Sequence, residues 1–365
     1  LETRDANRSL SSPSHESIGA NHSFHLRKLV RLNEVTFLIC MFQDIKPLRR
    51  CMGDPKRPPH DRGHELWTAE EGPSRMLLGS IDRWVGALLA DDGITMPFMG
   101  GSQSVSATIL ARSDGIVVGT SAVDHMLQIW APSLKISWMA GDGKKVSNGD
   151  EIASLSGDKE TLLAMERSIL NLLGQLSGIA TEAKRWSARA PGQIACTRKT
   201  VWGLMDKWAV HLGGGLTHRL HRSDATMLKE NDLATMYEEH DAHENRIVAY
   251  LQEFTGEDCG AFLEIEVRKD KEAIMAAAAW SQRDDTSNLP ELVVMLDNFG
   301  PERCKDIVSQ LKEMGLRENL WLEASGGIVY EQLDDWHESG IDVLSTSAVN
   351  RGVSPLDLSM IVDGA

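Results

Sequence analysis

Leu-Glu-Ile-Glu-Val at residues 263–267 (LEIEV) alternates apolar and acidic side chains without interruption. This alternation predicts a β-strand in which Glu264 and Glu266 point to the same face. On an edge strand that face could meet solvent. A central barrel strand has no such face, so two like charges on it would need a cation or a polyol opposite them. LEIEV is therefore either an ordinary edge strand or a central strand of an α/β barrel whose interior is polar.

Five further apolar runs accompany LEIEV, at intervals of about 20 to 40 residues, and helical patterns lie between them. Such repeated βα units predict a parallel sheet or an α/β barrel, in which chemistry gathers where strands end and loops begin. The runs cover residues 194–196, 225–228, 292–296, 320–323 and 343–345.

The preceding part of the chain has a different pattern. Apolar spacing predicts helices over residues 75–90 and 159–181. Short β-like runs at 107–111, 115–119, 136–139 and 141–155 lie between them, the last with DG and NG turn pairs, and they indicate a small α/β domain with an antiparallel sheet.

The helix at 159–181 carries an unusual face. Arg167, Asn171, Gly174 and Gly178 fall on one side, so a cation lies on a row of small residues that would let another backbone approach closely. A surface arginine above a helix-packing groove is the simpler alternative.

Charge is unevenly distributed. The formal net charge is −15, which argues against a surface for nucleic acid or anionic lipid. Residues 167–229 nevertheless carry a local charge of +7, against −22 for the rest of the chain. This basic segment suggests a concave site for an anionic small molecule, although a solvated basic face would give the same count.

The cysteines and the apolar segments indicate where in the cell the protein is located. The five cysteines are scattered without Cys-x-x-Cys spacing, which favours a reducing cytoplasm over a disulfide or zinc framework. The run VTFLICMF at residues 35–42 is too short to span a bilayer and no small-residue cleavage site follows it, so we expect no membrane segment.

Polar groups follow nearly every predicted strand: TRKT at 197–200, GGGLTHRL at 213–220, SDATMLKEN at 223–231, LDNF at 296–299, EASGG at 323–327 and STSA at 345–348. Together with ERSILNLLGQLSGIAT at 166–181 and LEIEV, this ordered set resembles the quinolinate phosphoribosyltransferases, which are type II phosphoribosyltransferases. The resemblance covers about 290 residues, in order.

The resemblance implies an α/β fold in which an N-terminal α/β sandwich domain is joined to an incomplete α/β barrel. We expect a poorly ordered tail or spurious extension at 1–75, the sandwich domain at 76–182, the catalytic barrel at 183–350, and a C-terminal helix at 351–365 returning to the sandwich domain. The implied reaction joins quinolinate to phosphoribosyl pyrophosphate, giving nicotinate mononucleotide, pyrophosphate and CO2 in NAD biosynthesis.

The resemblance also implies roles for individual residues. Cations would hold the quinolinate carboxylates, Arg167 would complete the site of a neighbouring subunit in a homodimer or larger homo-oligomer, and Glu266 and Asp297 would contact the ribose directly or around Mg²⁺. Lys199 would lie between quinolinate and pyrophosphate, and a helix near Ile328 would face the 5-phosphate. Lys199, Lys229, Glu266 and Asp297 are the implied catalytic residues; the implied binding residues are Arg167, Thr197, Arg198, Lys199, His218, Arg219, Lys229, Glu266, Asp297, Ala324, Ser325, Gly326, Ser345, Thr346 and Ser347.

The sequence departs from the family pattern near the site, at residues 201–205 after TRKT and at residues 345–352, as well as at Thr217 and Asp232. These changes spare the implied cations, so they bear on affinity more than on the class of reaction. The alternatives are a relative associated with molybdenum transport, an enzyme acting on another pyridine acid, and a non-enzymatic binding or regulatory protein.

Overall fold

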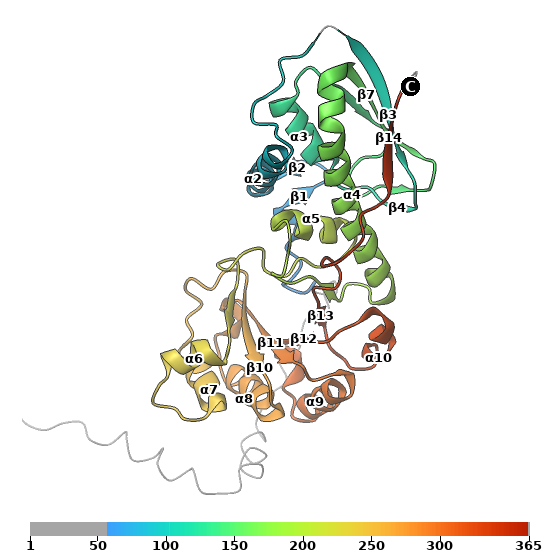
Figure 1. The fold of residues 1–365 in the computed structure, drawn as a ribbon. Coiled ribbons are helices and arrows are strands. Elements are labelled where there is room, and N and C mark those ends of the chain that lie inside the picture. The colour runs from blue at the N-terminus through green and yellow to red at the C-terminus, as the bar shows by residue number, and fades with distance from the viewer. Residues whose placement is uncertain (1–56, 102, 364–365) are drawn as a thin grey trace, which may run out of the picture. The chain divides into compact units, whose positions relative to one another are not determined.

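The computed structural model describes residues 57–101 and 103–363 (Figure 1). Every helix in this part of the chain is too short or too polar to cross a lipid bilayer. The run at 35–42 and most of the expected N-terminal tail lie outside the described residues.

A six-stranded parallel sheet organises the C-terminal part and confirms all six predicted runs (Figure 1). Its order is β8-β13-β12-β11-β10-β9, and the strands β8 and β9 at its two ends are not paired with each other. This open sheet, with helices between its strands, confirms the expected incomplete barrel. The strands are β8 (Ile194–Ala195), β9 (Thr226–Leu228), β10 (Phe262–Val267), β11 (Glu291–Asp297), β12 (Trp321–Ser325) and β13 (Val343–Ser345).

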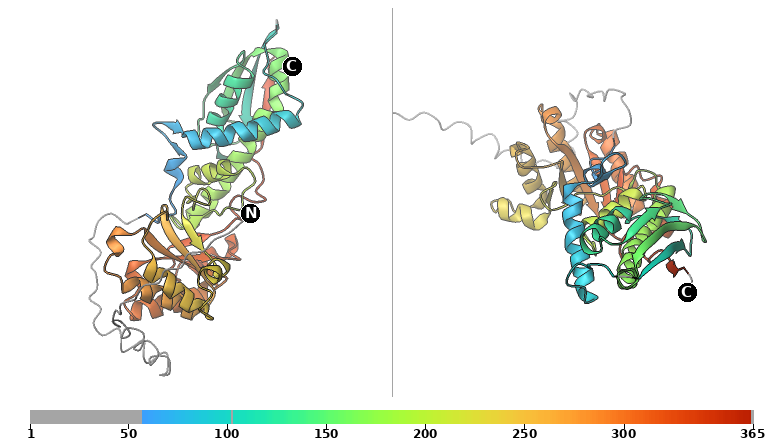
Figure 2. Two further views of the ribbon diagram at one scale, coloured as in Figure 1. Left: turned by 90° about the vertical axis from the view of Figure 1, so that its left-hand side faces the viewer. Right: turned by 90° about the horizontal axis from the view of Figure 1, so that it is seen from above.

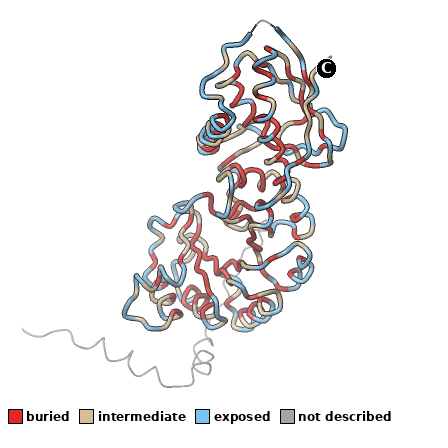
Figure 3. Tube along the Cα trace, in the orientation of Figure 1, coloured by how far each residue is buried: buried red, intermediate tan, exposed pale blue. Residues whose placement is uncertain are grey.

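The middle of the sheet is the core of this part (Figure 3). All six residues of β10 are buried, and in β11 only the two end residues are partly exposed. Strands covered on both faces are normally almost wholly apolar, so the glutamates of β10 are the exception that needs partners. The connecting helices are α5 (Leu204–Leu212), α6 (Glu230–Met236), α7 (His243–Glu253), α8 (Asp270–Ser281), α9 (Pro301–Glu313) and α10 (Leu333–Trp336), with 3-10 turns η3 (Thr286–Asn288), η4 (Arg317–Asn319) and η5 (Tyr330–Gln332).

A four-stranded antiparallel sheet of order β14-β3-β7-β5 forms the sandwich domain, as expected. Helix α2 contacts α3 and α5, and α3 contacts α4 (Figure 2). The elements are α2 (Arg75–Asp91), β3 (Ser104–Ala111), α3 (Thr120–Trp130), β5 (Lys135–Trp138), β7 (Glu151–Asp158), α4 (Lys159–Arg189) and β14 (Leu358–Val362), with the short pair β4 (Gly115–Ile116) and β6 (Lys145–Val146).

The C-terminal segment is a strand, so the expected C-terminal helix is wrong. β14 pairs antiparallel with β3, from Leu358 opposite Ala111 to Val362 opposite Ala107. It therefore returns to the sandwich domain as expected, but it does so by covering the free edge of β3. An unpaired strand edge exposes a row of backbone N–H and C=O groups, and β14 satisfies them.

Helix α4 confirms the close backbone approach predicted for its small-residue face. A side chain at Gly178 would collide with the carbonyl oxygen of Ser354, and the N–H of Leu356 donates to the carbonyl of Gly174 over 2.8 Å. The approaching backbone is thus the segment that leads into β14. The helix continues to Arg189, across the boundary expected at residue 182.

Residues 57–75 differ from the expected tail. They contain η2 (Gly63–Glu65) and the two-stranded sheet β1 (Trp67–Thr68) and β2 (Gly72–Pro73). His60 and Leu66 are fully buried. Their burial depends on contacts with residues far along the chain, which a search for local periodicity does not detect.

Candidate functional site

Polar residues singled out from the sequence lie along the edge of the parallel sheet at which its strands end. Asp297 at the end of β11 pairs with Ser325 of β12, and Ser325 pairs with Ser345 of β13. Ser345 in turn pairs with Ala195 of β8. Because parallel strands end at the same edge, segments distant in sequence meet here. The segments at or beyond these ends carry Thr197, Arg198, Lys199, Lys229, Ala324, Gly326, Thr346 and Ser347.

Glu266 lies between two cations. It is 4% exposed; the Nζ of Lys229 pairs with its Oε2, and Nη2 of Arg268 lies 3.2 Å from its Oε1. Arg268 Nε also lies 3.5 Å from Oδ2 of Asp297. This confirms that cations face one of the two LEIEV carboxylates, that of Glu266. Arg268 was not predicted, and its place directly after β10 is the signal that could have identified it.

Lys207 is a second unpredicted cation, held inside α5. Its side chain is buried, and Nζ donates to the carbonyl oxygens of Thr217 and Thr197 over 2.6 and 3.1 Å. Burial lowers the pKa of Lys207. These two bonds join the loop that carries Arg198 to the loop that carries His218, so Lys207 aligns the two segments.

The loop after TRKT is fixed by Asp206 of α5. Its carboxylate accepts from the N–H groups of Val201 and Trp202 over 2.9 and 3.1 Å. Asn350 donates to the same carboxylate and to the carbonyl of Lys199, each over 3.0 Å. The departure from the family pattern at 201–205 is therefore an ordered turn that supports the backbone of Lys199.

Arg198 lines a basic pocket of about 580 Å³. Arg75 and Arg83 of α2 and Arg222 also line this pocket, whereas Lys229, Glu266 and Asp297 do not.

Arg219 is turned inward. It is 8% exposed, and its Nη1 donates to the carbonyl oxygen of Ala225 over 3.2 Å. Burial lowers the pKa of Arg219, with smaller contributions from Arg198 and Arg222, while the charge of Glu264 opposes them. The guanidinium thus lies within electrostatic range of Arg198, with part of its donor capacity used by the backbone.

The loops after β12 and β13 are tightly built. Gly326 has φ +94°, and a side chain there would collide with Asn298. Thr346 Oγ1 donates to the carbonyl of Ile328 over 3.3 Å, which ties one loop to the other. The helix expected near Ile328 begins at Tyr330 as the 3-10 turn η5 and continues as the four-residue α10.

Arg167 lies outside both the Glu266 cluster and the basic pocket. It is exposed on α4 and lines a separate pocket of about 500 Å³ with Gly174, Trp202 and Pro355. Within the described residues it makes no ion pair. Its guanidinium is thus available to a group outside this chain.

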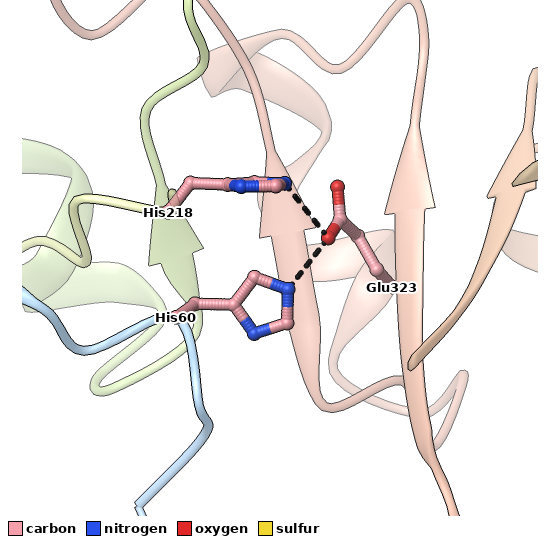
Figure 4. A group of neighbouring side chains, drawn as sticks. All are labelled: His60, His218 and Glu323. Carbon is pink, nitrogen blue, oxygen red and sulfur yellow. Dashed lines mark hydrogen bonds and ion pairs between the residues drawn. The ribbon is translucent and has the colours of Figure 1, made fainter. Parts of the chain in front are cut away.

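His60, His218, Glu264 and Glu323 form a buried cluster, also unpredicted as a unit. Figure 4 shows three of its members, His60, His218 and Glu323. Both imidazoles point at one carboxylate oxygen: His60 Nε2 lies 2.7 Å and His218 Nε2 3.2 Å from Oε2 of Glu323. Glu264 Oε2 lies 3.5 Å from His218 Nε2. Buried carboxylates require such partners, since an unpaired buried charge is very costly.

The protons in this cluster can be placed from its geometry. Burial acts to lower the pKa of His218, but Glu264 and Glu323 outweigh it and raise the pKa above its usual value. However, His218 Nδ1 accepts from the N–H of Arg219 over 2.7 Å, which opposes a second ring proton. We therefore assign the single ring proton to Nε2 and an additional proton to Glu264, whose pKa is raised by burial and by Glu323.

This assignment bears on metal binding. His60, His218 and Glu323 offer ligand atoms within 4.8 Å of one another. A metal would need the lone pair of His218 at Nε2, and the ring proton would then move to Nδ1, against the Arg219 N–H. The cluster therefore fits a proton-sharing network better than a metal site.

An open α/β barrel whose strand ends carry cations and carboxylates is typical of a class of enzymes whose chemistry gathers where parallel strands end. Family models described as the N-terminal and C-terminal domains of quinolinate phosphoribosyl transferase match residues 93–177 and 179–361. The chain belongs to the quinolinate phosphoribosyltransferase family.

Individual relatives agree with this membership. A probable nicotinate-nucleotide pyrophosphorylase [carboxylating] from Methanothermobacter thermautotrophicus is 34% identical, over 71% of this chain and 89% of the relative. A chloroplastic nicotinate-nucleotide pyrophosphorylase [carboxylating] from Arabidopsis thaliana is 32% identical, over 74% and 76%. The solved nicotinate-nucleotide pyrophosphorylase from Francisella tularensis is 26% identical with a TM-score of 0.65, over 78% of this chain and 96% of that one.

Proposed function

We propose that this protein transfers the phosphoribosyl group of phosphoribosyl pyrophosphate to the nitrogen of quinolinate, releasing pyrophosphate and CO2 to give nicotinate mononucleotide. The observation that carries the proposal is the cluster of Lys229, Glu266, Arg268 and Asp297 at the strand ends, in a chain of this family. Both substrates are polyanions, and phosphoribosyl pyrophosphate also carries ribose hydroxyls. Fixed cations suit the anionic groups, and the neighbouring carboxylates can accept hydrogen bonds from the hydroxyls.

Quinolinate would be held by cations from several strand ends. Arginine binds carboxylate with two parallel N–H groups, while lysine acts as a movable point charge. In this proposal Arg198, Arg219 and Lys229 hold the carboxylates, with Thr197 and His218 beside them. Lys199 lies between quinolinate and the leaving pyrophosphate. The cations also stabilise the negative charge left on the ring when CO2 departs.

Glu266 and Asp297 would accept hydrogen bonds from the ribose hydroxyls and stabilise the positive charge that develops on the ribosyl ring. We propose Mg²⁺ as the cofactor, because hard cations commonly bridge substrate phosphates with few protein ligands. The oxygens of Glu266 fit such an ion, but Lys229 and Arg268 already pair with them. Mg²⁺ would therefore be held mainly by pyrophosphate oxygens, with the two carboxylates around it.

The loops after β12 and β13 would hold the 5-phosphate through Ala324, Ser325, Gly326, Ser345, Thr346 and Ser347. We expect Gly326→Ala to raise the KM for phosphoribosyl pyrophosphate about 30-fold, because a side chain at φ +94° that also meets Asn298 costs about 2 kcal/mol. Steady-state kinetics measure this.

Gly327→Ala is the matched control for Gly326→Ala. Gly327 also has positive φ, at +66°, but no atom lies within 4 Å of a side chain built there. The KM for phosphoribosyl pyrophosphate should therefore rise less in Gly327→Ala than in Gly326→Ala. Equal effects of the two substitutions would mean that contact with Asn298 does not shape the loop.

The experiment that tests the proposed function supplies quinolinate, phosphoribosyl pyrophosphate and Mg²⁺ and follows nicotinate mononucleotide and CO2. Nicotinate then replaces quinolinate. We expect product with quinolinate alone. Product with nicotinate alone would indicate a different phosphoribosyltransferase, and tight binding without turnover would indicate a binding or regulatory protein.

Assembly and location complete the proposal. We propose at least a homodimer, in which Arg167 reaches the neighbouring site, because it is exposed and makes no ion pair within the described part of its own chain. A reducing, cytoplasmic compartment is supported by Cys196, Cys259 and Cys304, which are buried free thiols. The Arabidopsis relative is named chloroplastic, so location varies within the family.

A further inference from the structure

Residues 60–62 contact the loop that carries His218, although the matched family ranges begin only at residue 93. The N–H of Arg62 donates to Oγ1 of Thr217 over 3.2 Å. The guanidinium of Arg62 pairs with Asp224 over 3.1 Å, and Asp224 in turn accepts from the N–H of Leu220 over 2.8 Å. The short segment therefore holds the loop at residue 217 and again through the turn at 220–224.

His60 is more deeply buried than Arg62, whose side chain is 21% exposed, and it points toward Glu323 of the barrel sheet (Figure 4). Its side chain is fully buried, and its ring lies edge-on to that of His218 with centroids 4.9 Å apart. Phe262 of β10 lies at the same centroid distance from it. Packing on these rings fixes the imidazole plane, so that Nε2 is directed at Glu323.

Glu323 receives two donors on one oxygen, while its Oε1 has no partner. Burial acts to raise its pKa, but His218 and His60 outweigh this effect and hold the pKa well below its usual range. Glu264 is the other titratable group that faces His218. Without the His60 donor, the charged form of Glu323 would be less stable, and so would its hold on His218.

The contact between Glu323 and the His218 ring matters because the backbone of His218 is strained. His218 has φ +54°, a conformation that non-glycine residues rarely adopt. Such a conformation persists only where surrounding contacts impose it. The contacts that hold His218 include the Arg219 N–H at Nδ1, the Thr217 hydroxyl at its carbonyl, and Glu264 and Glu323 at Nε2. Glu323 is shared with His60.

We propose that His60 and Arg62 are positioning residues for quinolinate binding, which hold the 217–224 loop so that His218 and Arg219 face the substrate. The proposal rests on the proposed function. His60 acts through Glu323 on the His218 ring, and Arg62 acts through Asp224 and Thr217 on the loop backbone. Neither residue needs to touch the substrate.

The test compares His60→Leu, which keeps most of the volume but removes the donor, with His60→Gln, whose Nε2 can still reach Glu323. We expect the KM for quinolinate to rise about tenfold in the leucine variant, since a buried carboxylate loses a donor. The KM for phosphoribosyl pyrophosphate should stay within about twofold, because other residues hold it, and glutamine should restore most of the loss.

Two further measurements distinguish a positioning role of His60 from a role in the stability of the fold alone. The acid limb of kcat/KM for quinolinate should move to higher pH in His60→Leu, because loss of a donor raises the pKa of Glu323 and it is protonated earlier as pH falls. A crystal structure of this variant should show the His218 ring displaced from Glu323. That structural readout holds whatever substrate the enzyme uses, so failure of the proposed function would be seen separately in the wild-type assay.

His64→Ala is the control in the same segment, because its side chain is 61% exposed, and it should leave both KM values unchanged. Should His60→Leu not fold, Arg62→Gln provides the second test, with an expected rise of about threefold in the KM for quinolinate. The proposal is overturned if leucine and glutamine at position 60 change both KM values equally, or if His218 keeps its position without the His60 donor.

Discussion

Lys229→Ala and Arg198→Ala are each expected to lower turnover with quinolinate at least about 100-fold, as loss of a group that stabilises developing charge does. A charge pair at 4 Å contributes about 4 kcal/mol at an effective dielectric of 20, so one cation suffices for such an effect. Lys229 faces Glu266 at the strand ends, and Arg198 lines the basic pocket. Steady-state kinetics with both substrates measure the change.

Folding should survive both substitutions, because both side chains are on the surface: Lys229 is 51% exposed and Arg198 is also exposed. Lys312→Ala, which removes an exposed cation from α9, controls for the loss of one positive charge and should leave the kinetics unchanged. Near-normal kinetics in Lys229→Ala or Arg198→Ala would refute its assigned role, provided that thermal unfolding matches the wild type.

The parallel sheet could be predicted because its signals are local. Each strand is a short apolar run at the spacing that βα units require, and all six appear where expected. The alternating glutamates of LEIEV also predicted the need for facing cations, which Lys229 and Arg268 meet at Glu266. The position of Arg268 directly after β10 marks it as a candidate, but its contact with Asp297 depends on the pairing of β10 with β11.

The elements that were missed depend on long-range contacts. Residues 358–362 hold four apolar residues and Ser359, a run too short for periodicity to assign to helix or strand, and the free edge of β3 decides the outcome. His60 and Glu323 are 263 residues apart in the sequence, so no local signal connects them. Both segments, around His60 and at 358–362, gain structure only by joining an existing sheet or core.

The basic segment at 167–229 separates into two roles in the structure. Arg198 and Lys229 lie at or near the strand ends, whereas Lys207 is buried and joins two loops through carbonyl groups. Net charge along the sequence therefore predicted a basic region correctly but could not separate cations available to a ligand from one used in the scaffold. Burial makes that distinction, because a buried ammonium needs fixed acceptors.

Arg167→Ala and Lys229→Ala should each be nearly inactive alone and should regain activity together, if Arg167 completes the neighbouring site. In a symmetric dimer mixed at equal amounts, about half of the dimers contain one of each variant, and each of these has one intact site. About a quarter of wild-type activity is therefore expected. Arg167 is exposed on α4 and lines a pocket without Arg198 or Lys229, so it has no visible partner site in its own chain.

The mixing experiment needs proof that mixed dimers form, which two affinity tags purified in sequence provide. Refolding or prolonged incubation of each variant by itself is the control, since neither should gain activity. Restored activity in the doubly tagged fraction requires two incomplete sites to share one complete set of residues, and no contact within a single chain can produce it. Mixed dimers that remain inactive would place Arg167 outside the neighbouring site, and the exposed guanidinium on α4 would then contribute to assembly rather than to catalysis.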